Sequence, residues 1–362
     1  MRSQREFVME KREQLSNAKR ILIPIGLVGL SLLFSAIFIA ALGFDPLAVY
    51  AKMAKGAFGS LYGISESILQ AIPMMICALG VAIAFRMNIS NIGGEGQFTM
   101  GALAAAGVAI YCPGIPDVLK IPVMLIVGFA AGAAWGAVAI TPKALWNVNE
   151  TIVTLMFNYI AILAVDYLVF GPWRDNSGTN LAVSKMIPDS AKFGTYFDTR
   201  IHTGLFIAIA VAVLIWMFFN YTSKGYQIRV IGENPRAARY AGMNIKSNMF
   251  LVMLLSGGIA GIAGMSQVSG LVGRLEPNIA NGVGFTAIII AYLAKLRPGT
   301  IIIVSILFGG LTVGGYSIQM LSVPSQVVTM IQGVILLFVL GGEIFSRYRF
   351  VWRKKESELY DQ

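Results

Sequence analysis

Long apolar runs separated by short polar segments dominate the chain. A bilayer core about 30 Å thick needs roughly 20 apolar residues per helix. On that criterion the sequence predicts ten spans, at residues 21–42, 66–86, 97–112, 121–141, 151–170, 203–220, 248–268, 284–296, 299–316 and 324–343. Glycines flank the two short runs 97–112 and 284–296, so we expect these to be tilted, broken or only partly crossing.

Lysine and arginine are distributed unevenly between the two sets of connecting segments. With the N-terminus inside, the segments facing the cytoplasm hold 20 of the 28 basic residues and the outer segments hold 8. Because cytoplasmic loops carry the excess of basic residues in membrane proteins, we expect both termini in the cytoplasm. Residues 1–20 are then a basic tail, 21–345 one membrane domain and 346–362 a second tail. The longest loops are 171–202 outside and 221–247 inside.

The composition agrees with a lipid-facing protein. Hydrophobic residues make up 56% of the chain and charged residues 13%, against about 25% in a soluble domain. The net charge of +10 is spread over the ends of apolar runs, which excludes a nucleic-acid-binding face. Two cysteines and one histidine leave no catalytic Ser/His/Asp arrangement and no metal site. No GxxxxGK[ST] phosphate loop occurs, so any ATP that drives transport must bind to another chain.

Two distant segments of the chain are similar to each other. Residues 88–99 contain Asn-x-x-Asn followed by Gly, Phe and Thr, and residues 278–286 contain the same residue types in the same order. In the ten-span topology the first copy lies on the cytoplasmic side and the second on the outer side. That is the pattern of an inverted repeat, which in transporters places broken helices and the permeation route at the repeat interface. Chance similarity is the alternative for a match this short.

The loop 221–247 contains a short predicted helix. Asn234 is a candidate N-cap, Pro235 the first helical residue, and Gly242 the stop after the last turn. Three alanines would form a small apolar stripe that could lie in a groove of a partner protein: Ala237, Ala238 and Ala241. A solvated loop helix that carries the positive-inside charge is the alternative.

The string IGENPRAARYAGMN at residues 231–244 resembles the coupling-helix loop of ABC importer permeases of the ribose, nucleoside and branched-chain amino-acid type. In that family the loop docks into the ATP-binding subunit. The resemblance assigns ATPase coupling to a set of residues in this loop: Gly232, Glu233, Asn234, Pro235, Ala237, Ala238, Tyr240 and Gly242. It implies an all-α, type-II-importer-like permease.

A second string, NIGGEGQ at residues 91–97, resembles permeases that work with nucleoside receptors of the basic-membrane-protein type. Ribose-type permeases lack this string. The stretches 149–159 and 284–299 fit the same group, and the resemblance extends over about residues 60–345. Nucleosides are therefore the expected substrate class.

Glycines around Glu95 permit a non-helical backbone, which membranes tolerate where it is buried in protein or lines a cavity. An ionised carboxylate at mid-bilayer costs at least about 2.5–3.5 kcal/mol, so we expect Glu95 to be interfacial, paired or functional. With Asn91 and Gln97 it could hydrogen-bond sugar hydroxyls and base edges. Phe98 and Phe285 could supply flat faces for a base. A helix-breaking cap with close backbone packing is the alternative for Glu95 and its glycines.

The span 151–170 adds one more candidate for the substrate pathway. Glu150, Asn158 and Asp166 recur every eight residues and therefore share a helix face. We expect Asn158 to face the pathway, whereas Glu150 suits a helix N-terminus. Asp166 either joins the pathway or emerges at the outer interface.

These observations predict the membrane subunit of an ATP-driven nucleoside importer that works by alternating access in the bacterial cytoplasmic membrane. Its expected partners are an ABC ATPase, a second permease chain, an extracytoplasmic substrate-binding lipoprotein and membrane lipid. A heterodimer of permeases is favoured over a homodimer. A permease for simple sugars or branched-chain amino acids is one alternative. The other is an ion-coupled secondary transporter, which would titrate Glu95 or Asp166 and need no ATPase.

Overall fold

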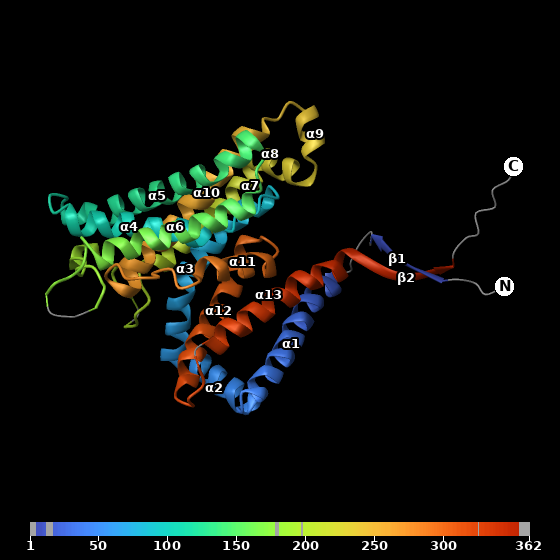
Figure 1. Cartoon of the computed structure of the whole chain (residues 1–362), viewed down its shortest axis with the longest axis horizontal. Helices are drawn as coiled ribbons and strands as arrows, with labels where there is room; N and C mark the ends of the chain where they lie inside the picture. The colour runs from blue at the N-terminus through green and yellow to red at the C-terminus, as the bar shows by residue number, and fades with distance from the viewer. Residues whose placement is uncertain (1–4, 12–16, 178–180, 197, 325, 355–362) are drawn as a thin grey trace. The chain divides into compact units, whose positions relative to one another are not determined.

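The computed structural model describes the whole chain except residues 1–4, 12–16, 178–180, 197, 325 and 355–362. Figure 1 shows that it is built almost entirely of helices. It divides into two compact parts, one of residues 1–48 with 324–362 and the other of residues 49–323.

The first part joins the two ends of the chain. Helices α1 (Asn17–Ala41) and α13 (Gln326–Arg347) pack against each other. Strands β1 (Arg5–Lys11) and β2 (Tyr348–Lys354) form an antiparallel pair. Both strands lie in segments that we expected to be simple tails, so the pairing is a feature that apolar patterning did not indicate.

The second part contains the remaining helices. In chain order they are α2 (Pro46–Phe58), α3 (Leu61–Arg86), α4 (Gly94–Tyr111), α5 (Asp117–Trp146), α6 (Glu150–Phe170), α7 (Gly204–Tyr221), α8 (Ser223–Glu233), α9 (Pro235–Tyr240), α10 (Ile245–Ser266), α11 (Val283–Leu293) and α12 (Pro298–Gln319). A 3₁₀ turn, η1 (Asp189–Ala191), and a π-helical turn, η2 (Gln267–Val272), complete the set.

Each of the ten predicted runs is helical, but not all of these helices are long enough to cross a membrane. In the described part of the chain six helices are long and apolar enough, or up to seven if α1 and α2 are one bent span. Helix α11 has 11 residues and extends about 16 Å, roughly half of a bilayer core. The run 284–296 was expected to be tilted, broken or only partly crossing, and the helix that it forms is shorter than the candidate spans.

Helices α3 and α10 form the centre of the larger part. In their apolar windows 83% and 72% of positions are buried, against 28% in α6. Helices α4, α5 and α10 approach closely at glycines: a Cβ on Gly101 or Gly132 would overlap the backbone of Gly261. Small residues allow the backbone-to-backbone packing that holds helices together in lipid.

The larger part has two distinct ends. Figure 1 shows α8 and α9 at one end of the bundle, and the loop 171–202, coloured yellow-green, at the other. This loop runs beside η2: the Phe193 N–H donates to the Ser269 carbonyl at 2.9 Å, and the Ile187 N–H to the Gly273 carbonyl at 2.9 Å. These ends are called the α9 end and the loop end below.

Candidate functional site

Polar side chains of the glycine-rich segment meet inside the bundle. The Asn91 amide donates to Gln97 Oε1 at 3.0 Å and to Ser256 Oγ on α10 at 2.9 Å. The Gln97 amide donates back to Asn91 Oδ1 at 3.1 Å. All three residues are fully buried. The structure therefore brings two predicted site residues together and adds Ser256, which the sequence pattern did not single out.

Asn158 on α6 binds the backbone around the start of α4. Its Oδ1 accepts a hydrogen bond from the Gly96 N–H at 2.8 Å, and its amide donates to the Ile92 carbonyl at 2.9 Å. The Thr154 hydroxyl, one turn earlier, accepts from the Ile92 N–H at 3.3 Å. Because buried backbone groups need partners, these two side chains permit the non-helical segment before α4 to lie within the protein.

Glu95 holds α4 and α11 together at their starting points. Its two carboxylate oxygens accept from the N–H groups of Gly282 at 2.7 Å and of Gly284 at 2.6 Å, and the residue is 1% exposed. A Cβ on Gly284 would overlap the Glu95 backbone, so the contact requires glycine. A carboxylate at a helix N-terminus compensates the helix dipole and satisfies N–H groups that have no partner within the helix. Glu95 thus caps α11 across the bundle.

The contacts of Glu95 and Asn91 lie well inside the bundle. Arg86, at the last residue of α3, donates to the Leu296 carbonyl at 2.8 Å and lies beside Gly232 of α8, which places the end of α11 at the α9 end. From there α11 rises about 16 Å to its start. Ser256 is 11 residues after the first residue of α10, again about 16 Å along its helix. The polar side chains therefore form a layer near mid-depth.

The two predicted aromatic residues are placed differently. Phe98 is fully buried, so in this structure it offers no ring face to a solute. Phe285, in the first turn of α11, is 40% exposed. In the described part of the chain no group of three or more His, Cys, Asp or Glu side chains could hold a metal ion.

The predicted helix of the loop 221–247 is confirmed as α9, with the expected caps. Asn234 Oδ1 accepts from the N–H groups of Arg236 and Ala237, both at 3.1 Å. Pro235 is the first helical residue, and Gly242 has a φ of +76°, which favours glycine. The cap therefore depends on residues that are neighbours in sequence.

The three alanines of this loop do not form one outward-facing stripe, so that prediction is wrong. Ala238 is fully buried, whereas Ala237 and Ala241 are exposed. A Cβ on Gly232 would overlap the Arg86 carbonyl. Gly232 and Ala238 therefore anchor the loop to its own chain, and the fully buried Ala238 presents no surface to another protein.

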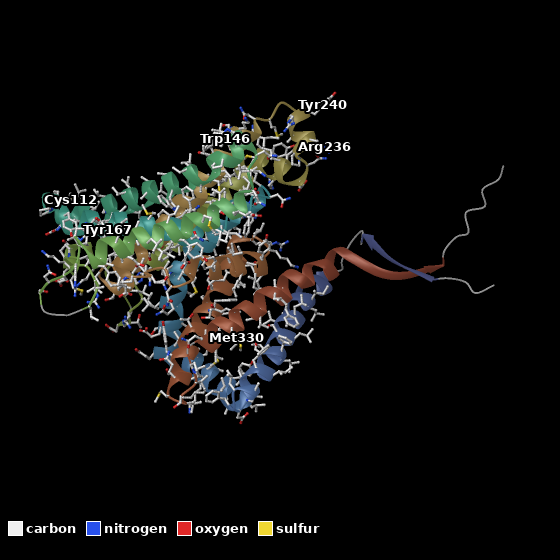
Figure 2. The ribbon with its side chains drawn as sticks, in the orientation of Figure 1. Cys112, Trp146, Tyr167, Arg236, Tyr240 and Met330 are labelled. Atoms are coloured by element: carbon white, nitrogen blue, oxygen red, sulfur yellow. The ribbon has the colours of Figure 1, made fainter. Side chains whose placement is uncertain are left out.

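Other residues of the loop 221–247 do face outward. Figure 2 shows Arg236 and Tyr240 pointing away from the bundle at its α9 end. Tyr240 is 97% exposed. The remaining predicted coupling residues, Glu233, Asn234 and Pro235, are exposed as well.

Comparison with known proteins identifies the class of this chain. A family model described as branched-chain amino acid transport system / permease component matches residues 63–340. The chain belongs to this family. It is a multi-pass membrane permease of the ABC-transporter type.

Several characterised proteins are similar to the permease over most of their length. The guanosine ABC transporter permease NupP of Bacillus subtilis is 34% identical, over 93% of this chain and 97% of its own. The glucose ABC transporter permease TsgB13 of Haloferax volcanii is 31% identical, over 90% and 88%. The nucleoside ABC transporter permease NupB of Lactococcus lactis is 28% identical, over 90% and 92%. The solved structure of PsaBC from Streptococcus pneumoniae in complex with Fab shares 17% identity over 81% of this chain, with a TM-score of 0.43.

The face of α6 that we expected to look inward is partly buried in the permease. Asn158 is 1% exposed, and Glu150 forms an ion pair with Lys143 at 3.1 Å. Asp166 is half-buried, and its Oδ1 has no hydrogen-bond partner in the described part of the chain. Glu150 therefore has a structural partner near the start of its helix, whereas the structure assigns none to the buried oxygen of Asp166.

The permease holds its single histidine at the loop end, outside the membrane-spanning helices. His202 Nδ1 accepts from the Gly204 N–H at 3.0 Å, and the side chain is fully buried. Burial, with a smaller contribution from the charge of Arg200, lowers the pKa of His202 to about 4. Arg200 itself pairs with Glu66 of α3 at 3.2 Å, which ties the loop 171–202 to the bundle.

We expect Glu95→Gln to destabilise the permease. A neutral amide replaces one carboxylate oxygen with a donor, so the Gly282 or the Gly284 N–H loses its acceptor, at a cost of about 1–3 kcal/mol. The measurement is the thermal unfolding midpoint in detergent, with Glu276→Gln as the control. Equal midpoints for the two variants would show that the carboxylate does not hold α11.

We expect permease stability to fall as the pH drops from about 6.5 toward 4. The ordinary pKa of a histidine is 6.5 and burial lowers that of His202 to about 4, so between these values the unfolded chain binds the proton and the folded chain does not. His202→Asn, which can retain an acceptor for the Gly204 N–H, should flatten this dependence. The measurement is the unfolding midpoint of both proteins at pH 4 to 7.5. Parallel curves would contradict the assignment to His202.

Proposed function

We propose that the permease is the translocation subunit of an ATP-driven nucleoside importer in the bacterial cytoplasmic membrane. The observation that carries the proposal is its 34% identity, over 93% of the chain, to a permease named for guanosine. A second relative, named for nucleosides, is 28% identical over 90% of the chain.

The geometry supports a transport role. Helices α4 and α11 both begin inside the bundle, where Glu95 joins them. Transporters commonly place their solute sites at such interrupted helices near mid-membrane, because a helix terminus exposes backbone groups that a continuous helix uses internally. In the proposed mechanism, rigid-body motion of these elements exposes the site first to the outside and then to the cytoplasm.

The exposed face of α9 supports docking of a separate ATPase. Tyr240 and Arg236 project from a helix that Asn234 caps and Ala238 anchors. Exposed tyrosine and arginine are typical anchors of protein interfaces. In this proposal α9 lies in the cytoplasm, as do both termini, and ATP-driven closure of the ATPase moves α9. A second, different permease chain and a substrate-binding lipoprotein complete the importer.

One observation favours a second candidate substrate. TsgB13, named for glucose, is 31% identical over 90% of this chain. A sugar and a nucleoside share hydroxyl groups, and they differ in the flat base.

Uptake measurements distinguish the two substrates. In cells that express the complete transporter and lack their own nucleoside and glucose uptake, we expect labelled guanosine to accumulate and labelled glucose to remain at background. Cells without this chain provide the background. Accumulation of glucose alone would overturn the nucleoside assignment and support the sugar alternative.

Tyr240→Ala tests ATPase docking. The side chain is 97% exposed, so its removal costs no internal packing. If it is an interface anchor worth about 2 kcal/mol or more, uptake and ATPase co-purification should fall by about thirtyfold. The control is Tyr167→Ala, which truncates a tyrosine that is 74% exposed on α6. Normal uptake by Tyr240→Ala at an equal amount in the membrane would contradict docking through this face of α9.

A further inference from the structure

The second copy of the repeated segment, residues 278–286, exposes polar side chains between the loop end and the start of α11. Asn278 and Asn281 are exposed, and they precede the start of α11, where Phe285 is 40% exposed. The side-chain amides of both asparagines make no hydrogen bond within the described part of the chain. Phe285 lies four residues after Asn281, in the first turn of α11.

The first copy of the repeat is different in this respect. The Asn91 amide is fully buried and bonded to Gln97 and Ser256. Asn88 and Asn278 occupy matching positions and both have left-handed backbones, with φ of 62° and 54°. The two copies therefore share a local backbone feature. One copy uses its inner asparagine to hold the bundle together, and the other leaves its asparagine amides free.

The position of the start of α11 in the bilayer limits what can surround the asparagine side chains next to it. The start of α11 lies about 16 Å from its α9 end, near the middle of a bilayer core about 30 Å thick. A polar group without a partner in hydrocarbon costs several kcal/mol, and irregular backbone at this depth is tolerated only where it is buried in protein or lines an aqueous cavity. Asn281 is exposed next to this helix start, so lipid is an unfavourable neighbour for it. Asn278 lies farther toward the loop end, three residues after Leu275, which binds Ser184 of the loop 171–202.

The chemistry of the exposed groups favours a neutral solute. The carboxylate of Glu95 already occupies the N–H groups at the start of α11. That helix end is therefore not free to bind a phosphate, as helix N-termini otherwise do. The groups that remain are two amides, which pair with base edges and hydroxyls, and an aromatic ring, on which a base can stack.

We propose that Asn278, Asn281 and Phe285 form a solute contact site that lines the water-filled pathway on the outward side of the mid-membrane layer. It binds unphosphorylated nucleosides through amide hydrogen bonds and ring stacking. The proposal rests on the proposed nucleoside importer and assigns its contact residues. The polar groups of Asn91, Gln97 and Asn158 serve instead to hold the helices that flank this site.

Cysteine labelling tests water access to the site. The natural cysteines are Cys77, which is buried, and Cys112, which is exposed, so Cys112→Ala provides the background. In intact cells with the complete transporter, Phe285→Cys should react with a charged, membrane-impermeant thiosulfonate added outside. Saturating transported solute should slow that reaction. The control is Leu163→Cys on α6, whose side chain is 65% exposed and faces lipid in this account, and which should remain unlabelled.

Glycine substitutions test the amides without straining the backbone. Asn278 and Asn281 have positive φ, which glycine adopts freely, so Asn278→Gly and Asn281→Gly remove only the side chains. Each lost hydrogen bond should lower the uptake rate at limiting solute by about two- to tenfold. Asn88→Gly is the matched control, because it has the same left-handed backbone at the α9 side of the layer and should transport normally.

The outcomes separate the site from the substrate assignment. If Phe285→Cys is labelled and guanosine slows the labelling, both the solute contact site and the nucleoside assignment are supported. If glucose slows the labelling and guanosine does not, the solute contact site is supported and the nucleoside assignment is overturned. Absence of labelling, labelling that no transported solute slows, or uptake by both asparagine variants equal to that of Asn88→Gly would overturn the site even if guanosine uptake is normal.

Discussion

The carboxylate of Glu95 is the contact on which the arrangement of the polar layer depends. It accepts two backbone hydrogen bonds at the start of α11, and the backbone of Glu95 packs directly on Gly284. A charged acceptor in a water-poor surrounding forms stronger hydrogen bonds than a neutral one, and its charge offsets the positive ends of the helix dipoles. This contact lets α11 begin inside the bundle, where its first N–H groups would otherwise lack acceptors.

The interrupted helices leave backbone groups without partners in their own helix, and side chains of neighbouring helices bind those groups. Asn158 and Thr154 on α6 bind the backbone before α4, and Ser256 on α10 accepts from Asn91. Polar side chains in a membrane protein are therefore not automatically solute ligands. Here the most deeply buried ones stabilise irregular backbone, and the chemically similar Asn278 and Asn281 are left exposed. This difference between the two similar segments, residues 88–99 and 278–286, underlies the assignment of the solute contact site.

Close packing joins α8 and α9 to the rest of the bundle at the α9 end. Gly232 packs against the end of α3, and Ala238 is buried beneath the exposed face of α9. Helix α3 is the most buried span, and Arg86 at its end binds the carbonyl of Leu296 after α11. A displacement of α9 would therefore reach α3 through Gly232 of the adjoining helix α8, and the segment after α11 through the side chain of Arg86. In the proposed importer, this is a short route from the ATPase to the polar layer.

Features that depend on neighbouring residues could be predicted from the amino-acid sequence. Apolar run length placed ten of the thirteen α-helices of the described chain, because the cost of exposing polar groups to lipid is set segment by segment. The start and end of α9 followed from Asn234, Pro235 and Gly242, since a cap involves groups within a few positions of each other. The expectation that Glu95 is paired or capping was one of several that the glycine-rich string allowed.

The hydrogen-bond partners of these residues follow from how distant segments pack in the fold. Glu95 and Gly282 are 187 positions apart, and Asn91 and Ser256 are 165 apart, so no local pattern selects them. The outward direction of Tyr240 and the inward direction of Ala238 depend on the packing of α9 against its own bundle. The similar segments 88–99 and 278–286 also differ because of packing. Their residue types are alike, but Asn91 is buried and Asn281 is exposed. Burial depends on which helices surround each segment, and the local sequence does not encode that.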